Sequence, residues 1–276
     1  MTSAETPQIL DATNRPVWAR RVSDFLAADT WTDAGERNLL SALAPRIRGH
    51  RLLDVGVGAG RTAWLLPLLS DDYTAIDYTA EMVTAAKRAH PDLDIRLGDA
   101  RALRDFADAS FDFVMFSNNG LDALAHSDRQ AALREFHRVL APGGILMYST
   151  LDRTGRDFSA RPWRRFDRSG RFSRPHRALA FTARLPLHLP RYARETANWL
   201  TVRRRAEDHG TWAIAPLAAL EFQLLVHYTT PDGARAEVED AGFRMESMTD
   251  DRGAAIVAAT THRADHGFFH VVAVKP

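Results

Sequence analysis

The sequence predicts an α/β fold in which a mainly parallel sheet carries helices on both faces. Between about residues 51 and 151, short apolar runs alternate with segments of helical periodicity, which is typical of successive βαβ units. The composition agrees, because 45% hydrophobic and 26% charged residues are typical of a globular chain with a substantial core. The length of 276 residues is enough for one large α/β domain with an insertion, or for two modest domains.

Strands are expected wherever a short apolar or alternating run is bounded by turn residues. The fourth of these runs, SFDFVMFSNN, alternates and then becomes continuously apolar, as a buried central strand does. The expected strands are 51–55, 73–77, 93–99, 110–119 and 145–151.

Helices are expected between these strands. Residues 61–69 can form one, although the proline within this run should end or kink it. Residues 79–90 begin with a threonine N-cap and are stopped by Pro91. Residues 127–140 have apolar positions three and four apart, which indicates an amphipathic helix.

The pattern changes after the fifth strand. Nine arginines occur between Asp152 and Arg177, interleaved with aromatic residues and prolines. Strand and helix signals return only with a helix at 231–243 and two closing strands at 244–249 and 267–275. Residues 152–228 are therefore expected to be an insertion on the core, partly helical, rather than a separately folding unit.

A glycine-rich turn, DVGVGAGR, follows the first strand from Asp54 to Arg61. Its glycines at positions 56, 58 and 60 allow a tight turn and let a ligand approach main-chain N–H groups. A dinucleotide-binding turn would carry glycines at the first, third and sixth positions, whereas the sixth position here is Arg61. Asp77 closes the second strand 21 positions after Gly56, where a carboxylate can accept hydrogen bonds from both ribose hydroxyls.

These features together resemble the class I, Rossmann-like S-adenosylmethionine-dependent methyltransferases. The glycine spacing resembles the first motif of that family, and GDAR after the third strand, FDFVMFSNN and EFHRVLAPGGILMYS resemble its later segments. The resemblance covers roughly residues 36–151. It implies a seven-stranded sheet with an antiparallel last strand, and the cofactor S-adenosyl-L-methionine outside the carboxyl ends of the strands.

The resemblance also implies a domain plan and a cofactor site. The plan is an N-terminal helical cap segment (1–50), a cofactor-binding core (51–151), an insertion or lid over the acceptor site (152–228) and a C-terminal completion of the sheet (229–276). Tyr78 and Met82 offer apolar surface to an adenine, and Asp99 could accept its exocyclic amine. The expected cofactor-binding residues are Asp54, Gly56, Gly58, Gly60, Asp77, Tyr78, Met82, Asp99, Ala100, Ser117 and Asn118.

The catalytic candidates follow the fourth strand. FSNNGLDAL resembles an FSxNGxD pattern in a bacterial subgroup, which implies that Asn119 and Asp122 face the region between cofactor and acceptor. His126 is a third candidate, and it could equally cap a helix. A general base is needed only if the acceptor must lose a proton, so no single base is favoured. The insertion adds His176, His209 and His227 as further candidates.

Composition excludes several functions. A formal charge of +1 gives no field for nucleic acid or a membrane surface, and the absence of cysteine excludes disulfides and thiolate metal sites. No run approaches the roughly 20 apolar residues that cross a bilayer, and no signal pattern is present. We therefore expect a cytoplasmic enzyme without a metal that acts on a small molecule, with a natural-product intermediate as one option, and that is a monomer or a homodimer.

Alternatives remain open. A non-catalytic S-adenosylmethionine-binding protein, or another reaction on the same scaffold, would share these motifs. A nicotinamide oxidoreductase would share the fold, but Arg61 breaks its glycine spacing and no Tyr-x-x-x-Lys pair is present. The arginine-rich run is either a solvated face or a lid that recognises a carboxylate or phosphate. Residues 16–38, with Trp18, Phe25 and Trp31, either cover the cofactor or pack a leading helix on the core.

Overall fold

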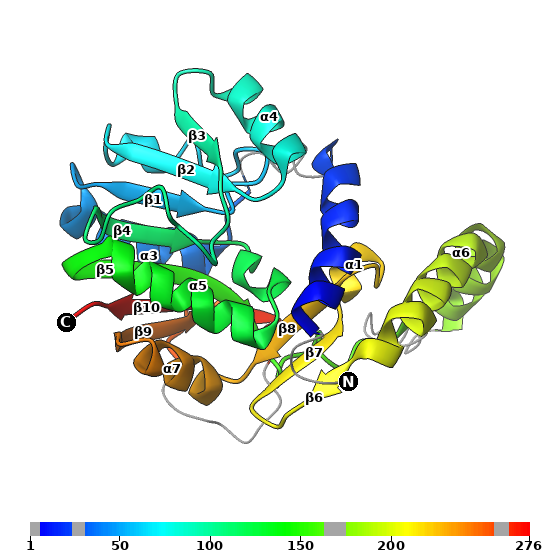
Figure 1. Ribbon diagram of the computed structural model, residues 1–276. Coiled ribbons are helices and arrows are strands. Elements are labelled where there is room, and N and C mark those ends of the chain that lie inside the picture. Colours follow the sequence, from blue (N-terminus) through cyan, green and yellow to red (C-terminus); the bar gives the residue numbers. More distant parts are fainter. Residues whose placement is uncertain (1–5, 24–30, 163–174, 257–264) are drawn as a thin grey trace.

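A computed structural model describes residues 6–23, 31–162, 175–256 and 265–276 of the chain (Figure 1). Its centre is a seven-stranded sheet in the order β3-β2-β1-β4-β5-β10-β9. The strands are β1 (Leu52–Val55), β2 (Tyr73–Asp77), β3 (Asp94–Leu97), β4 (Phe111–Phe116), β5 (Leu140–Leu151), β9 (Arg244–Asp250) and β10 (Phe268–Val274). β10 alone runs antiparallel to both of its neighbours, β5 and β9. The expected sheet, with its antiparallel last strand, is confirmed.

Helices cover both faces of this sheet. On one face pack α5 (His126–Val139) and α7 (Pro231–Asp240), whose apolar side chains share a buried cluster with β4, β5 and β10. On the other face α3 (Ala34–Ile47) and α4 (Ala80–Ala89) pack against the opposite side chains of β1, β2 and β4. Because β1 and β4 are covered on both sides, their near-continuous apolar sequences are explained.

The segment after β1 differs from the expectation. Residues 61–69 form turns and a 3₁₀ helix, η1 (Leu66–Leu68), instead of an α-helix. The N–H groups of Ala63 and Leu65 bond three residues back, to Gly60 and Thr62. Two causes prevent a regular α-helix here. Pro67 has no N–H to donate. In addition, the hydroxyl of Thr62 donates to the buried carboxylate of Asp54 at 2.5 Å, which fixes the turn against β1.

The insertion contains a second sheet that the sequence did not indicate. β6 (Glu207–Asp208), β7 (Trp212–Pro216) and β8 (Leu225–Thr229) form an antiparallel sheet in that order. Its β8 joins the end of β5 through an Asp152–Thr229 bridge. The expected helix is confirmed as α6 (Pro175–Val202), which extends away from the two sheets (Figure 1). Short 3₁₀ turns follow at η5 (Arg203–Arg205) and η6 (Ala218–Leu220).

The first helix, α1 (Thr6–Arg20), lies beside the carboxyl edge of the main sheet (Figure 1). Its buried Asn14 exchanges two hydrogen bonds with the backbone of Leu225 in β8, at 2.7 and 3.2 Å. Leu10 and Val17 are also buried. The second sheet therefore holds α1 in place. Within the described residues, no helix is both long and apolar enough to cross a membrane.

Candidate active site

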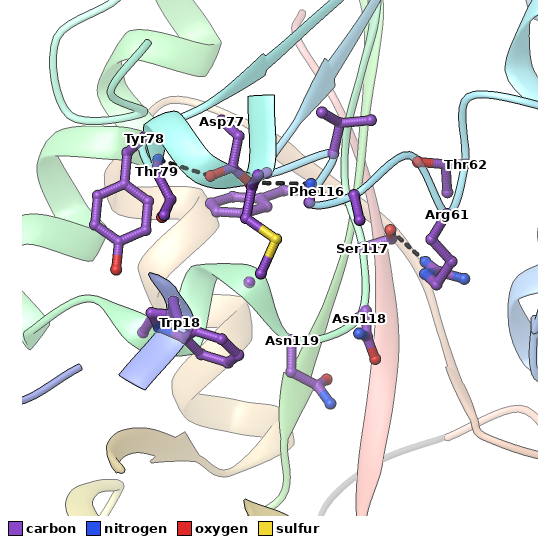
Figure 2. Close-up of a pocket in the computed structure, with 17 residues that line it drawn as sticks. Trp18, Arg61, Thr62, Asp77, Tyr78, Thr79, Phe116, Ser117, Asn118 and Asn119 are labelled. Carbon is purple, nitrogen blue, oxygen red and sulfur yellow. Dashed lines mark hydrogen bonds between the residues drawn. The ribbon is translucent and has the colours of Figure 1, made fainter. Parts of the chain in front are cut away.

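A pocket opens where β1, β2 and β4 end at their carboxyl edge, the position in which parallel α/β sheets bind ligands (Figure 2). It brings together eight of the residues expected from the sequence, which are Gly56, Gly58, Asp77, Tyr78, Met82, Ser117, Asn118 and Asn119. Trp18, Arg61, Thr79 and Phe116 also line it.

Asp77 provides the buried carboxylate of this pocket. One of its oxygens accepts the backbone N–H of Gly58 at 3.0 Å, and the other accepts that of Thr79 at 2.8 Å. The residue is only 7% exposed, and burial raises the pKa of its carboxyl against the opposing effect of the two N–H donors. Each oxygen keeps a further lone pair, so the fixed carboxylate can accept hydrogen bonds from ligand hydroxyls.

Gly56 and Gly58 in the turn are each required for a different reason. A Cβ at Gly56 would collide with the ring of Phe116, and Gly56 has a φ of +67°. Gly58, at φ +59°, has nothing within 4 Å of the position where its Cβ would lie. The first glycine therefore admits the aromatic wall of the pocket, and the second keeps the pocket open to a ligand.

The apolar surface comes from two sides. Tyr78 and Met82 follow β2, and Figure 2 shows Trp18 of α1 across the pocket from Asp77. Arg15 fastens α1 here, because its guanidinium donates to the carbonyl of Tyr78 at 2.9 Å and lies 5.2 Å from the centre of the Tyr78 ring. Trp18 is thus placed over the pocket. Trp31 is 51% exposed, and Phe25 lies outside the described residues.

An ion pair between Arg61 and Glu36, which the sequence does not predict, supports the side of the pocket formed by the glycine turn. The guanidinium of Arg61 bonds both carboxylate oxygens of Glu36 at 2.8 Å, the carbonyl of Trp31 at 2.8 Å and the hydroxyl of Ser117 at 2.5 Å. Glu36 is buried, and its interactions with Arg61 outweigh burial and raise the pKa of the guanidinium. The only signal in the sequence was Arg61 itself, as the residue that interrupts the glycine spacing.

Asn119 is the catalytic candidate that lines the pocket. Its φ of +58° is left-handed, and its backbone N–H donates to the hydroxyl of Ser149 at 2.7 Å. Its Oδ1 atom is buried and has no hydrogen-bond partner among the described residues. An unsatisfied buried acceptor beside a pocket fits a ligand that carries a donor.

Four expected cofactor residues are not in the lining. Asp54 lies beneath the turn, where it accepts from Thr62 and from the Tyr73 hydroxyl at 2.9 Å, and burial raises its pKa to about 6. Gly60 leaves room for His90 instead of a ligand. Asp99 is held by the guanidinium of Arg101 at 2.7 to 3.1 Å. Ala100 is buried next to it.

Two catalytic candidates also lie outside the lining. Asp122 is fully buried, and its carboxylate accepts from Arg129 at 2.5 Å, from the Thr150 hydroxyl and from the backbone of Leu151. His126 instead meets His227 of the second sheet, at 3.1 Å between ring nitrogens. Of Asn119, Asp122 and His126, only Asn119 lines the pocket.

Known proteins resemble the chain in this region. A family model described as a methyltransferase domain matches residues 53–148. A malonyl-[acyl-carrier protein] O-methyltransferase of Erwinia billingiae is 33% identical over 153 residues, which are 55% of this chain and 58% of the relative. A demethylmenaquinone methyltransferase of Renibacterium salmoninarum is 38% identical over 111 residues, or 40% of this chain and 45% of the relative. The chain thus spans about half the length of these relatives.

The fold is also shared with a solved structure. The 1,6-didemethyltoxoflavin-N1-methyltransferase of Burkholderia thailandensis, solved with 1,6-didemethyltoxoflavin and S-adenosylhomocysteine, superposes with a TM-score of 0.58 at 16% identity. The match covers 98% of this chain and 90% of that one. The glycine turn, the strand order and the matched domain all indicate the same methyltransferase fold. Residues 53–148 thus match a methyltransferase domain, and the chain as a whole shares the Rossmann-like fold of a solved methyltransferase.

Proposed function

We propose that this chain transfers a methyl group from S-adenosylmethionine to a small-molecule acceptor. The observation that carries the proposal is the fixed, buried carboxylate of Asp77 at the glycine turn of a pocket with apolar walls. This combination suits a ligand that has vicinal hydroxyls and an aromatic base but no phosphate.

The residues present fit that cofactor group by group. Asp77 would accept the ribose hydroxyls, while Tyr78 and Met82 offer surface to the adenine. The unsatisfied Oδ1 of Asn119 would accept from the ammonium group of the methionine part. When bound, S-adenosylmethionine supplies a methyl group activated by a positively charged sulfur.

The protein's own contribution is alignment and exclusion of water. Trp18 and Phe116 close the pocket with apolar surface, which removes competing water from the reacting atoms. A nucleophilic atom of the acceptor forms the bond to the methyl carbon while the carbon–sulfur bond breaks and its electron pair stays on sulfur. Good alignment can contribute about 7–11 kcal/mol, so the transfer does not require a general base unless the acceptor is a hydroxyl.

Recognition of the acceptor belongs, in this proposal, to residues 152–228. These residues lie outside the matched segment 53–148, and the second sheet within them holds α1 and therefore Trp18. The relatives above are named for different acceptors, malonyl-[acyl-carrier protein] and demethylmenaquinone. A role in specialised metabolism stays a hypothesis, as do the cytoplasmic location and the choice between monomer and homodimer. Most of the arginine-rich run lies outside the described residues.

The cofactor part of the proposal can be tested with a pair of glycine variants. Gly58→Val places a side chain in the open pocket, and Gly49→Val makes the same change at φ +73°, also in open space, in the turn after α3. S-adenosylhomocysteine binding, measured by calorimetry, should be lost in Gly58→Val and kept in Gly49→Val. Equal binding by both folded variants would contradict the assignment of the pocket.

Transfer and acceptor recognition need a second experiment. Wild-type protein is incubated with methyl-labelled S-adenosylmethionine and a panel of hydroxyl, amine and carbon acceptors. A variant in which a short linker replaces residues 175–188 of α6 should bind the cofactor normally and lose transfer. If the variant loses cofactor binding as well as methyl transfer, the segment belongs to the core. If the wild-type protein binds the cofactor but transfers no methyl group to any acceptor, the non-catalytic alternative is favoured.

A further inference from the structure

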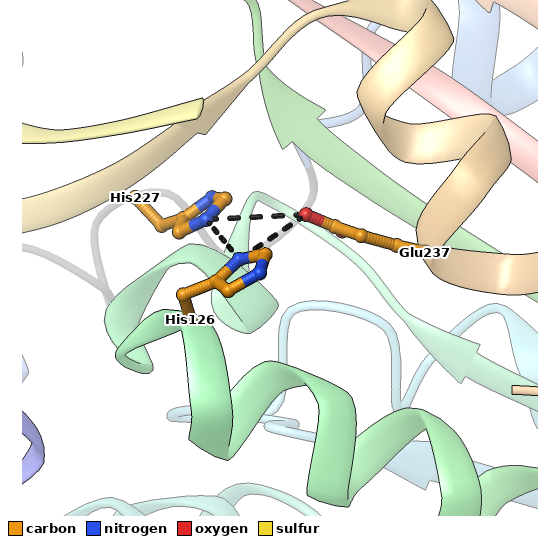
Figure 3. A group of neighbouring side chains, drawn as sticks. All are labelled: His126, His227 and Glu237. Atoms are coloured by element: carbon orange, nitrogen blue, oxygen red, sulfur yellow. Dashed lines mark hydrogen bonds and ion pairs between the residues drawn. The ribbon is translucent and has the colours of Figure 1, made fainter. Parts of the chain in front are cut away.

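Three potential metal ligands meet between the second sheet and the core (Figure 3). They are His126 at the start of α5, His227 in β8 and Glu237 in α7. The His126 Nδ1 and His227 Nε2 atoms are 3.1 Å apart. The Glu237 Oε1 atom lies 3.7 Å from the first and 3.9 Å from the second. None of these residues lines the methyl-transfer pocket.

The three atoms present more lone pairs than the protein satisfies. Glu237 is 6% exposed, and its Oε1 has no hydrogen-bond partner among the described residues. The distances of 3.7 and 3.9 Å are too long for hydrogen bonds from either imidazole. A single proton can bridge the two histidines, but it leaves this buried carboxylate oxygen without a donor. A cation between the three atoms would satisfy all of them.

The spacing fits a transition-metal ion. A triangle with sides of 3.1, 3.7 and 3.9 Å has a centre about 2.1 Å from each corner, which matches Zn–N and Zn–O bond lengths. At that bond length, octahedral neighbours would be about 3.0 Å apart and tetrahedral ligands about 3.4 Å, so the two longer sides favour tetrahedral over octahedral coordination. We propose that His126, His227 and Glu237 bind a divalent transition-metal ion of the zinc type.

Neighbouring side chains hold the proposed ligands in place. The guanidinium of Arg129 donates to the other oxygen of Glu237, at 2.8 and 3.2 Å, and so turns Oε1 toward the histidines. The charge of Arg129 is also balanced by Asp122. The Nε2 atom of His126 lies 3.2 Å from the side-chain amide of Gln130. Such contacts orient ligands in protein metal sites.

The site's position suggests its role. His227 is fully buried in the second sheet, whereas the other two ligands belong to helices of the core. The side chain of His126 is 25% exposed, so a water molecule can reach the fourth coordination position. A bound ion would therefore clamp the second sheet, which carries α1, onto the core. The sequence predicts no metal because it has no cysteine and no local cluster of histidines, whereas His126 and His227 lie 101 residues apart.

The proposal is tested by metal titration of the full, tag-free chain after treatment with a chelator. Co²⁺ should bind with one ion per chain and give the strong visible absorption of tetrahedral coordination. Zn²⁺ should displace it, with a dissociation constant below about 1 μM. Zn²⁺ should also raise the melting temperature of the wild-type protein, because an ion that binds only the folded state stabilises it.

Variants separate this site from adventitious binding. His126→Asn should weaken Zn²⁺ binding by at least about 100-fold and abolish the rise in melting temperature. His137→Asn, on the same helix but outside the cluster, should do neither. If the first variant does not fold, Glu237→Gln provides the same test and keeps an oxygen for Arg129. Failure of the wild-type protein to bind Co²⁺ or Zn²⁺, or equal binding by both histidine variants, would overturn the proposal.

Discussion

Substitution of Asp77 by alanine tests the centre of the proposed cofactor site. The carboxylate is 7% exposed and fixed by the N–H groups of Gly58 and Thr79, so its remaining lone pairs are already oriented for a ligand. Little of the binding energy is spent on ordering this side chain. Its removal should therefore affect ligand affinity directly.

The magnitude follows from hydrogen bonds to a charged group, which contribute about 1.5–3 kcal/mol. This free energy corresponds to a loss of affinity of about 10- to 160-fold for S-adenosylhomocysteine. The variant also leaves the N–H groups of Gly58 and Thr79 without their acceptor, at a cost of about 1–3 kcal/mol each in stability. Binding must therefore be measured well below the melting temperature of the variant.

The assay is calorimetric titration with S-adenosylhomocysteine, with circular dichroism to confirm folding. Asp94→Ala is the matched control, because it removes an exposed carboxylate from the neighbouring strand β3 and should bind normally. Burial raises the pKa of Asp77, so wild-type affinity should fall as pH decreases through that raised pKa, and this dependence should be absent in Asp77→Ala. An unchanged dissociation constant in the folded variant would remove Asp77 from the site.

Three further predictions concern the surrounding structure. Arg129→Ala leaves two buried carboxylates without their partner and should lower the free energy of unfolding by about 3–5 kcal/mol; a denaturation curve that shows less than about 1 kcal/mol would contradict the buried ion network. S-adenosylhomocysteine should slow hydrogen exchange around Trp18 but not around the buried Leu10, and exchange that does not change near Trp18 would refute its role as a cover. The hydrogen bond that His266 donates to the carboxylate of Asp152 raises the pKa of His266, so this pair should stabilise the fold fully below the unfolded pKa of about 6.5 and lose its effect as pH rises through the folded value. The free energy of unfolding of wild-type and His266→Asn proteins should be compared at about pH 6 and about pH 9. An equal difference between the two proteins at both pH values would disprove this contribution of the His266–Asp152 pair.

The sequence by itself determined the parts of this protein that depend on local pattern. Apolar runs, caps and turns predicted the seven strands of the main sheet, because the alternation of βαβ units is written in neighbouring residues. The glycine spacing and Asp77 were also local signals, since each lies at the end of its own strand. Parallel strands bring such ends to one edge, which is why eight expected residues meet in the pocket.

Only the tertiary structure decided the features made by residues far apart in the chain. The second sheet was missed because its strands gain their burial from α1 and β5, which lie far from them in the chain. The buried positions of Asp122 and Asp54 could not be distinguished from pocket positions, since a sequence pattern does not show which polar partner lies nearby. Arg61 meets Glu36 across 25 residues, and His126 meets His227 across 101. Such pairs form because folding buries them together, and burial is a property of the packed chain as a whole.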